Sequence, residues 1–318
     1  MLTVQFLAND REILLSFQHM WGDKISSLLH LFEDGQLNRR ELVERLTKYT
    51  GSIAAAIAAI DAAGLAEAQT LTGPPVGVQV PDNDPAIFSQ TLTISGDGPL
   101  FVYQSVPVDW ATTRRPAVLV IHENRGLTEY IKDVTRRLAK AGYVAVAVDL
   151  LSRQGGSDRF ADPEAGVAAY GRTRPEERRT DMLATLLTIR DQVYVRGDRL
   201  GVIGFCAGGG NVMDLALNTD ALSAAVNFYG APVPPASEVG RINTPILFNY
   251  AELDRNLTAS MAPFMQALAQ NQKRFEVHVY HNANHAFHND TGPRYDAAAA
   301  TDAWQKTLDF LNRYLNRA

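Results

Sequence analysis

From residue 116 to the end of the chain, short and nearly continuous apolar runs alternate with longer segments of helical periodicity. Such uninterrupted runs are typical of parallel strands that are buried on both faces. The expected strands are Ala117–Ile121, Tyr143–Val148, Arg199–Ile203, Ala224–Phe228, Ile246–Tyr250 and Phe275–Tyr280. Helices are expected at about 130–141, 176–195, 211–219, 259–271 and 295–315. The alternation predicts an α/β fold with a mostly parallel, doubly wound sheet and flanking helices.

A β-hairpin is expected ahead of this alternating region. The segment from Gly73 to Pro99 is rich in proline, glycine and aspartate, which is typical of a linker that runs into strands. The runs Phe88–Ile94 and Leu100–Val106 flank the turn sequence Gly96-Asp97-Gly98. We therefore expect these two runs to pair as antiparallel strands.

Residues 1–72 show a different pattern, which predicts helices. Two apolar faces with helical spacing are visible, formed by Ile25, Leu28, Leu29 and Phe32 before Gly35, and then by Leu42, Val43 and Leu46. A segment rich in alanine and isoleucine follows. We expect a helical appendage over residues 1–72 and a main α/β domain over residues 73–318.

An export signal is the alternative interpretation of residues 38–68. The arginine pair in Asn38-Arg39-Arg40-Glu41-Leu42, the apolar run Gly51–Ile60 and the small-residue sequence Ala66-Glu67-Ala68 match the parts of a twin-arginine signal with its cleavage site. The long segment before the arginine pair and the acidic Asp61 argue against it. We favour a retained appendage and a cytoplasmic location.

Composition and charge exclude several classes of function. Of the 318 residues, 46% are hydrophobic and 20% are charged, which is ordinary for a globular protein. The net charge of −5 provides no basic surface for nucleic acid, and no apolar run is long enough to span a membrane. The expected partner is therefore a small molecule, while the oligomeric state is not predicted.

The single cysteine, Cys206, lies where a strand is expected to turn into a helix. The sequence Gly204-Phe205-Cys206-Ala207-Gly208 has the G-x-S-x-G spacing of a nucleophile elbow, with cysteine in the serine position. The start of the helix favours a thiolate, because the positive end of the helix dipole lies there. The alternatives are a buried structural cysteine and a phosphate-binding loop, but no phosphate-loop motif is present.

A thiol nucleophile requires a base, and the base requires an orienting carboxylate. Polar groups of an open α/β sheet gather beyond the carboxyl ends of its strands. Asp254 follows the run Ile246–Tyr250, and His285 follows Phe275–Tyr280. The order nucleophile, acid, histidine is that of α/β-hydrolases. The competing candidates are Glu252 for the acid and His281 or His288 for the base.

These histidines raise the alternative of a metal site. His281 and His285 lie in a loop of asparagine and alanine residues, with no companion cysteine. We therefore expect no metal, and no cofactor is predicted.

The motifs taken together resemble the dienelactone hydrolase family, whose best-known activity is carboxymethylenebutenolidase. The resemblance covers about residues 85–318, which is most of the chain. It rests on His122-Glu123-Asn124-Arg125-Gly126-Leu127, Asp149-Leu150-Leu151-Ser152-Arg153, Gly204-Phe205-Cys206-Ala207-Gly208-Gly209, Asp254 and His285-Ala286-Phe287. The resemblance implies an α/β-hydrolase fold and hydrolysis of a lactone or small carboxylic ester.

The resemblance also implies a catalytic triad of Cys206, His285 and Asp254. Glu123 is then expected to contact the resting thiol and to help ionise it when substrate arrives. A carboxylate beside a thiol disfavours a second negative charge, so this arrangement keeps the resting thiol neutral. The backbone N–H groups of Ala207 and Asn124 are expected to form the oxyanion hole.

The sequence departs from the family pattern where substrate is bound. The family's dienelactone enzymes have an arginine four residues after the catalytic histidine, and here that position is Asn289. A second family arginine has no clear equivalent among Arg172, Arg174, Arg178 and Arg179, of which Arg172 is the candidate. A catalytically silent scaffold that binds a ligand or protein is the alternative function, but the four separated site residues argue against it.

Overall fold

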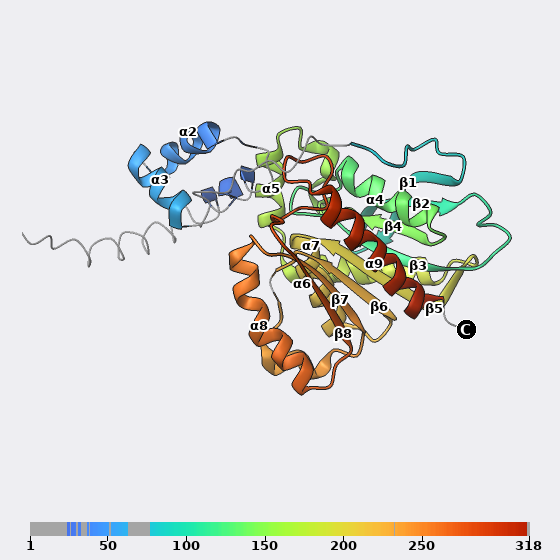
Figure 1. Ribbon diagram of the computed structural model, residues 1–318. Coiled ribbons are helices and arrows are strands. Elements are labelled where there is room, and N and C mark those ends of the chain that lie inside the picture. Colours follow the sequence, from blue (N-terminus) through green and yellow to red (C-terminus); the bar gives the residue numbers. More distant parts are fainter. Residues whose placement is uncertain are drawn as a thin grey trace, which may run out of the picture.

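The computed structural model of the protein contains one eight-stranded sheet (Figure 1). The residues that it describes are 77–231 and 233–316, together with 24, 25, 27–29, 31, 32, 37, 39–50 and 52–62 nearer the N-terminus. The strands are β1 (Ile87–Gly96), β2 (Gly98–Pro107), β3 (Arg115–Ile121), β4 (Val144–Val148), β5 (Val195–Phe205), β6 (Ala224–Phe228), β7 (Ile246–Ala251) and β8 (Phe275–Tyr280).

The strands lie in the order β1-β2-β4-β3-β5-β6-β7-β8 across the sheet. β1 and β2 form the predicted antiparallel hairpin, with Gly96 opposite Gly98, and β2 pairs antiparallel with β4. Every other neighbouring pair, from β4 and β3 to β7 and β8, is parallel. The mostly parallel sheet is confirmed, and this strand order and direction are those of an α/β-hydrolase fold.

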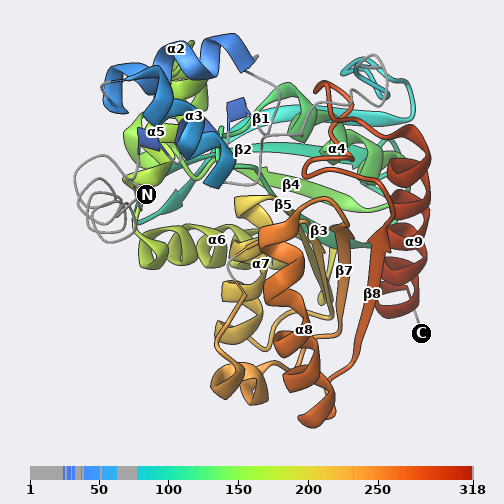
Figure 2. The same cartoon turned by 60° about the vertical axis from the view of Figure 1, so that its left-hand side comes forward.

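Helices cover both faces of the sheet (Figure 2). The helices are α4 (Glu129–Lys140) and α9 (Ala297–Leu315) on one face, and α6 (Pro175–Arg190), α7 (Ala207–Asn218) and α8 (Arg255–Gln270) on the other. Short 3₁₀ turns at Ser152–Gln154, Ser157–Arg159 and Ala236–Arg241 lie in the connections. Because both faces are covered, all residues of β4, β6 and β7 are buried, whereas the edge strand β1 is largely exposed.

Three elements differ most from the expectation. The helix expected over 176–195 ends at Arg190, and β5 begins already at Val195. The early start of β5 was missed because the four residues after Val195 include three charged ones, are not buried and give no apolar signal. A further helix, α5 (Pro163–Gly171), was not predicted. Its alanine and glycine residues form no periodic apolar face. The helix begins instead through local chemistry, with Asp162 accepting a hydrogen bond from the Glu164 N–H and proline in the first turn.

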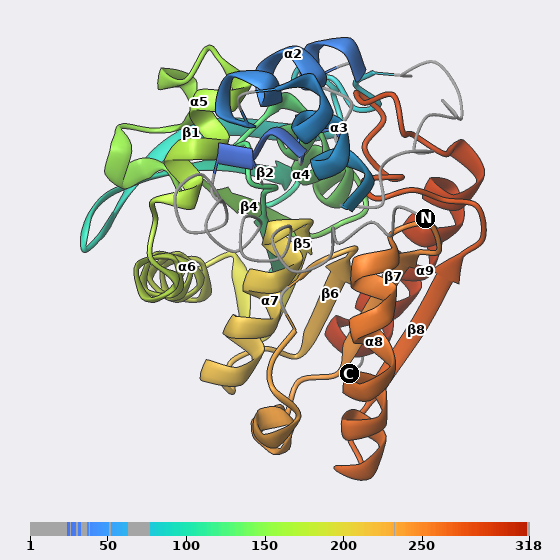
Figure 3. The same ribbon diagram turned by 90° about the vertical axis from the view of Figure 1, so that its left-hand side faces the viewer.

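Two N-terminal helices, α2 (Arg39–Thr50) and α3 (Ile53–Ala62), lie beside α5 (Figure 3). Their apolar residues form a small separate core together with Val167 of α5 and with four residues that precede α2, namely Leu28, Leu31, Phe32 and Leu37. Arg45 of α2 forms an ion pair of 2.6 Å with Glu164 of α5. Helices in this region are therefore confirmed. Gly35 and the cleavage sequence Ala66-Glu67-Ala68 lie outside the described residues, so the division into domains and the export alternative stay predictions.

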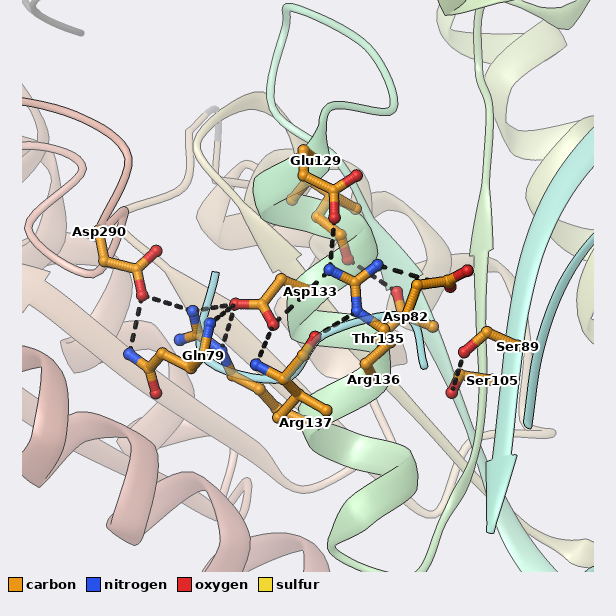
Figure 4. Close-up of polar contacts among 12 residues, drawn as sticks. Gln79, Asp82, Ser89, Ser105, Glu129, Asp133, Thr135, Arg136, Arg137 and Asp290 are labelled. Atoms are coloured by element: carbon orange, nitrogen blue, oxygen red, sulfur yellow. Dashed lines mark hydrogen bonds and ion pairs between the residues drawn. The ribbon is translucent and has the colours of Figure 1, made fainter. Parts of the chain in front are cut away.

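A buried ion cluster ties α4 to two distant segments (Figure 4). Arg137 contacts Asp133 on its own helix, and its Nη2 donates to Asp290 Oδ2 at 2.5 Å. Asp133 Oδ1 accepts from the Val80 N–H at 2.8 Å, and Gln79 Nε2 donates to Asp290 Oδ2 at 2.8 Å. The cluster therefore fixes the segment that leads into β1 and the loop that follows β8. None of the helices among the described residues is long and apolar enough to cross a bilayer.

Candidate active site

Cys206 lies in the turn between β5 and α7, and it is almost completely buried. Its backbone has φ 55° and ψ −121°, a conformation that non-glycine residues rarely adopt. The turn leaves no space at its two flanking glycines. A Cβ on Gly204 would lie 2.3 Å from the Gly208 carbonyl oxygen, and one on Gly208 would lie 2.4 Å from the Ile121 carbonyl oxygen. The backbone thus has the geometry that the G-x-C-x-G spacing predicts for a nucleophile elbow.

His285 and Asp254 are brought together by the loops that follow β8 and β7. Their side chains are hydrogen-bonded, with 2.5 Å between His285 Nδ1 and Asp254 Oδ2. Burial lowers the pKa of the His285 imidazole, but the charges of Cys206 and Asp254 raise it more, so the pKa lies well above its usual value. Burial likewise raises the pKa of Asp254, but the neighbouring His285 outweighs it and the pKa is lowered.

The competing candidates from the sequence lie elsewhere. Glu252 and His281 form a pair of their own, with 2.5 Å between His281 Nδ1 and Glu252 Oε2, and the His281 side chain is 79% exposed. His288 is buried, and its Nδ1 lies 2.8 Å from the hydroxyl of Tyr130. Of the candidate bases, His285 is the one that hydrogen-bonds to Cys206, and Asp254 is the carboxylate that pairs with His285.

Glu123, in the loop that follows β3, is fully buried. Its Oε2 accepts hydrogen bonds from Arg125 Nη2 at 2.9 Å and from Asn289 Nδ2 at 3.1 Å. The Oδ1 of Asn289 in turn accepts from the Thr291 hydroxyl at 2.7 Å. The sequence indicated Asn289 as a substrate contact, which stays a prediction. It gave no sign that the Asn289 amide contacts Glu123, since the two residues are distant in the chain.

Tyr229 is a site residue that the sequence analysis missed. Tyr229 is fully buried, and its backbone has a φ of 39°. The centre of its ring lies 5.1 Å from the centre of the His285 ring. Burial raises the pKa of its hydroxyl well above the usual value, and the charges of Tyr130, Glu123 and Cys206 add to the effect. The sequence could have indicated Tyr229 as a site residue, because it follows β6 directly and polar groups gather at the carboxyl ends of parallel strands.

The structure distinguishes between the four arginines that follow β4. Arg178 lies over the ring of Tyr170 at 5.0 Å and donates from Nε to Asn211 Oδ1 at 3.2 Å. The charges of both Arg178 and Cys206 affect the pKa of Tyr170, which burial raises. The other three lie on the surface or in ion pairs, with Arg172 exposed at the end of α5, Arg174 against Glu177 and Arg179 against Asp214.

The expected oxyanion donors, Ala207 and Asn124, lie in two loops that contact each other. Ala207 is the first residue of α7, and Asn124 belongs to the loop between β3 and α4. Gly208 packs against the carbonyl oxygens of Ile121 and His122, which brings the two loops together. Among the residues that the structure describes, no group of three or more histidine, cysteine or carboxylate side chains could hold a metal ion.

Comparisons with known proteins concern the family and the fold. The model of the dienelactone hydrolase family matches residues 102–315. A candidate 2-oxo-3-(5-oxofuran-2-ylidene)propanoate lactonase of Bradyrhizobium sp is 35% identical over 67% of this chain and 89% of its own length. A candidate carboxymethylenebutenolidase of Escherichia coli strain K12 is 34% identical over 63% of this chain and 77% of its own. The crystal structure of a candidate dienelactone hydrolase from Klebsiella pneumoniae superposes with a TM-score of 0.65 at 27% identity, over 72% of this chain and all of that one.

Proposed function

The chain belongs to the dienelactone hydrolase family and is a hydrolase, and from this premise we propose that it uses Cys206 to hydrolyse a lactone or small carboxylic ester. The observation that carries the proposal is the strained Cys206 backbone beside the hydrogen-bonded pair of His285 and Asp254. A strained conformation persists only where the surrounding structure holds it, and such conformations cluster at active sites. The lactonase name of the Bradyrhizobium relative supports a lactone as the substrate class.

The first half of the reaction acylates the cysteine. The Cys206 thiolate, whose proton lies on His285, attacks the substrate carbonyl carbon, a C–S bond forms, and the carbonyl electrons move to oxygen. The N–H groups of Ala207 and Asn124 stabilise that oxyanion. The C–O bond to the leaving group then breaks as His285 donates its proton to the departing oxygen. In a lactone the ring opens, and the alcohol stays attached to the acyl group.

The second half releases the acid. His285, now neutral, accepts a proton from a water molecule, whose oxygen attacks the thioester carbon. The C–S bond breaks, and Cys206 departs as a thiolate beside the reprotonated His285. Asp254 holds His285 in the required orientation throughout and stabilises its charged form, which is consistent with the raised pKa of His285.

Glu123 is proposed to control the charge of Cys206. Its carboxylate disfavours a neighbouring thiolate, while the charged His285 favours it. Arg125 and Asn289 both donate hydrogen bonds to Glu123. A substrate that disturbs either hydrogen bond therefore changes the position of the carboxylate and its effect on the thiol. This is a means of coupling substrate arrival to activation of the thiol.

The test uses purified full-length protein with a small aryl ester and a lactone. We expect one equivalent of iodoacetamide to abolish hydrolysis of both, and Cys206→Ala to lower kcat by several orders of magnitude with an unchanged fold. Cys206→Ser serves as the second variant, because it keeps the size of the side chain. Hydrolysis by Cys206→Ala above about one per cent of wild type would exclude Cys206 as the nucleophile.

A further inference from the structure

We propose that His122 is a positioning residue that orients the Glu123–Asn124 peptide, so that the Asn124 N–H points to the oxyanion site. His122 follows β3 directly and is fully buried. None of the catalytic steps uses its side chain. The inference rests on the proposed function, because that function gives the Asn124 N–H its role as an oxyanion donor. The hydrogen bonds of His122 do not depend on that function.

The hydrogen bonds of the His122 ring determine which nitrogen carries the proton. Nε2 accepts from the backbone N–H of Leu150 at 2.9 Å. Because that N–H can only donate, Nε2 holds a lone pair and no proton. Nδ1 lies 2.5 Å from the carbonyl oxygen of Glu123, which can only accept. His122 is therefore neutral, with its proton on Nδ1 donated to the Glu123 carbonyl.

The charged groups near the ring are consistent with a neutral imidazole. Burial lowers the pKa of His122, the charge of Asp149 and the bond to the Glu123 carbonyl raise it, and the charge of Arg178 lowers it further, with a net lowering. Asp149 Oδ1 lies 4.0 Å from Nε2, beyond hydrogen-bonding distance. The Leu150 N–H already occupies that nitrogen.

Fixing the Glu123 carbonyl also fixes the Asn124 N–H. The two groups belong to one planar trans peptide and point in opposite directions. His122 reaches the carbonyl from the side of Leu150, which follows β4. The Glu123 carbonyl points to the His122 ring, on the side of β4, so the Asn124 N–H of the same peptide points to the opposite side. Because β3 lies between β4 and β5 in the sheet, that opposite side is the side of β5, the strand that leads to Cys206. That direction is the one that an oxyanion donor requires.

The far end of the same loop is held independently. The Leu127 N–H donates to Ser157 Oγ at 2.7 Å, and Ser157 Oγ donates to Asp149 Oδ1 at 2.7 Å. The Gly126 N–H makes a longer contact of 3.3 Å with the Glu123 carbonyl. A change at His122 would therefore disturb the orientation of one peptide without releasing the whole loop.

Two variants separate the two hydrogen bonds of the ring. His122→Gln places an acceptor near the position of Nε2 and loses the donor to Glu123, whereas His122→Asn places a donor near Nδ1 and loses the acceptor for Leu150. We expect H122Q to lower kcat about 10- to 100-fold, with KM within about twofold, which is less than the roughly 100- to 1,000-fold lost when an oxyanion donor is removed, because the Asn124 N–H is misoriented but still present. H122N should retain clearly more activity than H122Q.

Alkylation of Cys206 by iodoacetamide provides the internal control, because it needs the thiolate and no oxyanion hole. We expect the alkylation rate of H122Q to stay within about twofold of wild type. Wild-type turnover by H122Q, or equal losses of turnover and alkylation, would overturn the inference. Failure of the proposed function gives a different result, namely hydrolysis that persists in Cys206→Ala.

The protonation of His122 can be measured without any substrate. In ¹⁵N NMR spectra of histidine-labelled protein, we expect one neutral ring with its proton on Nδ1 between about pH 6.5, the usual histidine pKa, and pH 8, identified by its absence in H122N. A charged ring in this range, or a proton on Nε2, would contradict the inference whatever the outcome of the kinetic experiments.

Discussion

The side-chain amide of Asn289 donates a hydrogen bond of 3.1 Å to the buried carboxylate of Glu123. Asn289 lies four residues after His285, where the sequence predicts a contact with substrate. The relationship connects the loop of the proposed base to the carboxylate that is proposed to control the thiol. It also provides a direct way to test the role of that carboxylate.

We predict that Asn289→Leu destabilises the protein by about 1–3 kcal/mol, because it leaves a buried carboxylate with one fewer donor. Turnover should fall as well, since Glu123 is then held by fewer contacts. The matched control is Thr291→Val, which removes a hydroxyl that bonds to Asn289 but keeps the contact with Glu123. Thermal unfolding and kcat of both variants check the prediction, and equal effects would contradict it.

Glu123→Gln should raise the reactivity of Cys206 at low pH. Removing a negative charge near a thiol favours its thiolate, so the pH at which alkylation reaches half its maximal rate should decrease. Turnover should fall, because control of the thiol is lost. The control is Glu252→Gln, which removes an exposed carboxylate that is paired with His281. An unchanged alkylation profile in E123Q would assign Glu123 a purely structural role.

The pair of Asp254 and His285 should make stability depend on pH. The raised pKa of His285 stabilises the fold fully below its unfolded value of about 6.5, and this contribution is lost as pH rises through the folded pKa. The lowered pKa of Asp254 stabilises the folded protein above the unfolded value of about 3.9, and this contribution is lost as pH falls through the folded pKa.

Asp254→Asn should therefore lower the pKa of His285 and remove much of this dependence. We expect the Tm of the wild type to decrease more steeply than that of D254N as pH rises above about 6.5. The kcat of D254N should fall by a large factor, because His285 loses its orienting partner. Parallel Tm profiles of the two proteins would show that the pair adds no pH-dependent stability.

Gly208→Ala should be among the most damaging small substitutions in the chain. The new methyl group would overlap the carbonyl oxygens of Ile121 and His122, which are backbone atoms with little freedom to move. We expect a loss of about 3 kcal/mol, the upper end of the range for overpacking. Gly171→Ala is the control, since its Cβ would meet nothing within 4 Å and should change stability by no more than about 0.5 kcal/mol.

Neutral substrates should be hydrolysed at least as efficiently as carboxylate-bearing ones. Asn289 offers no charge, and loss of one charge-assisted hydrogen bond costs an anionic substrate about 1.5–3 kcal/mol. The measurement is kcat/KM for an acid and its methyl ester. A strong preference for the acid would point to Arg178 beside Tyr170, and Arg178→Gln should then abolish that preference while Arg179→Gln leaves it intact.

The fold was predictable where apolar residues carry the signal. A buried parallel strand such as β6 needs a continuous apolar run, and its predicted bounds match the observed ones. The first residues of β5 and the whole of α5 escaped prediction, because half-exposed strands and alanine-rich helices need no such runs. Their formation depends on neighbours and caps that hydrophobic periodicity does not report.

The sequence by itself determined the turn around Cys206 and the candidate residues that follow each strand, because tight turns and strand ends impose local requirements on residue type. Only the tertiary structure decided which candidates meet. It paired His285 with Asp254 and left His281 with Glu252 on the surface. It also placed Asn289 against Glu123 and the ring of His122 against the Glu123 carbonyl. The physical reason is that hydrogen-bond partners are chosen by distance in the folded chain, and strand order, which no local pattern encodes, sets those distances.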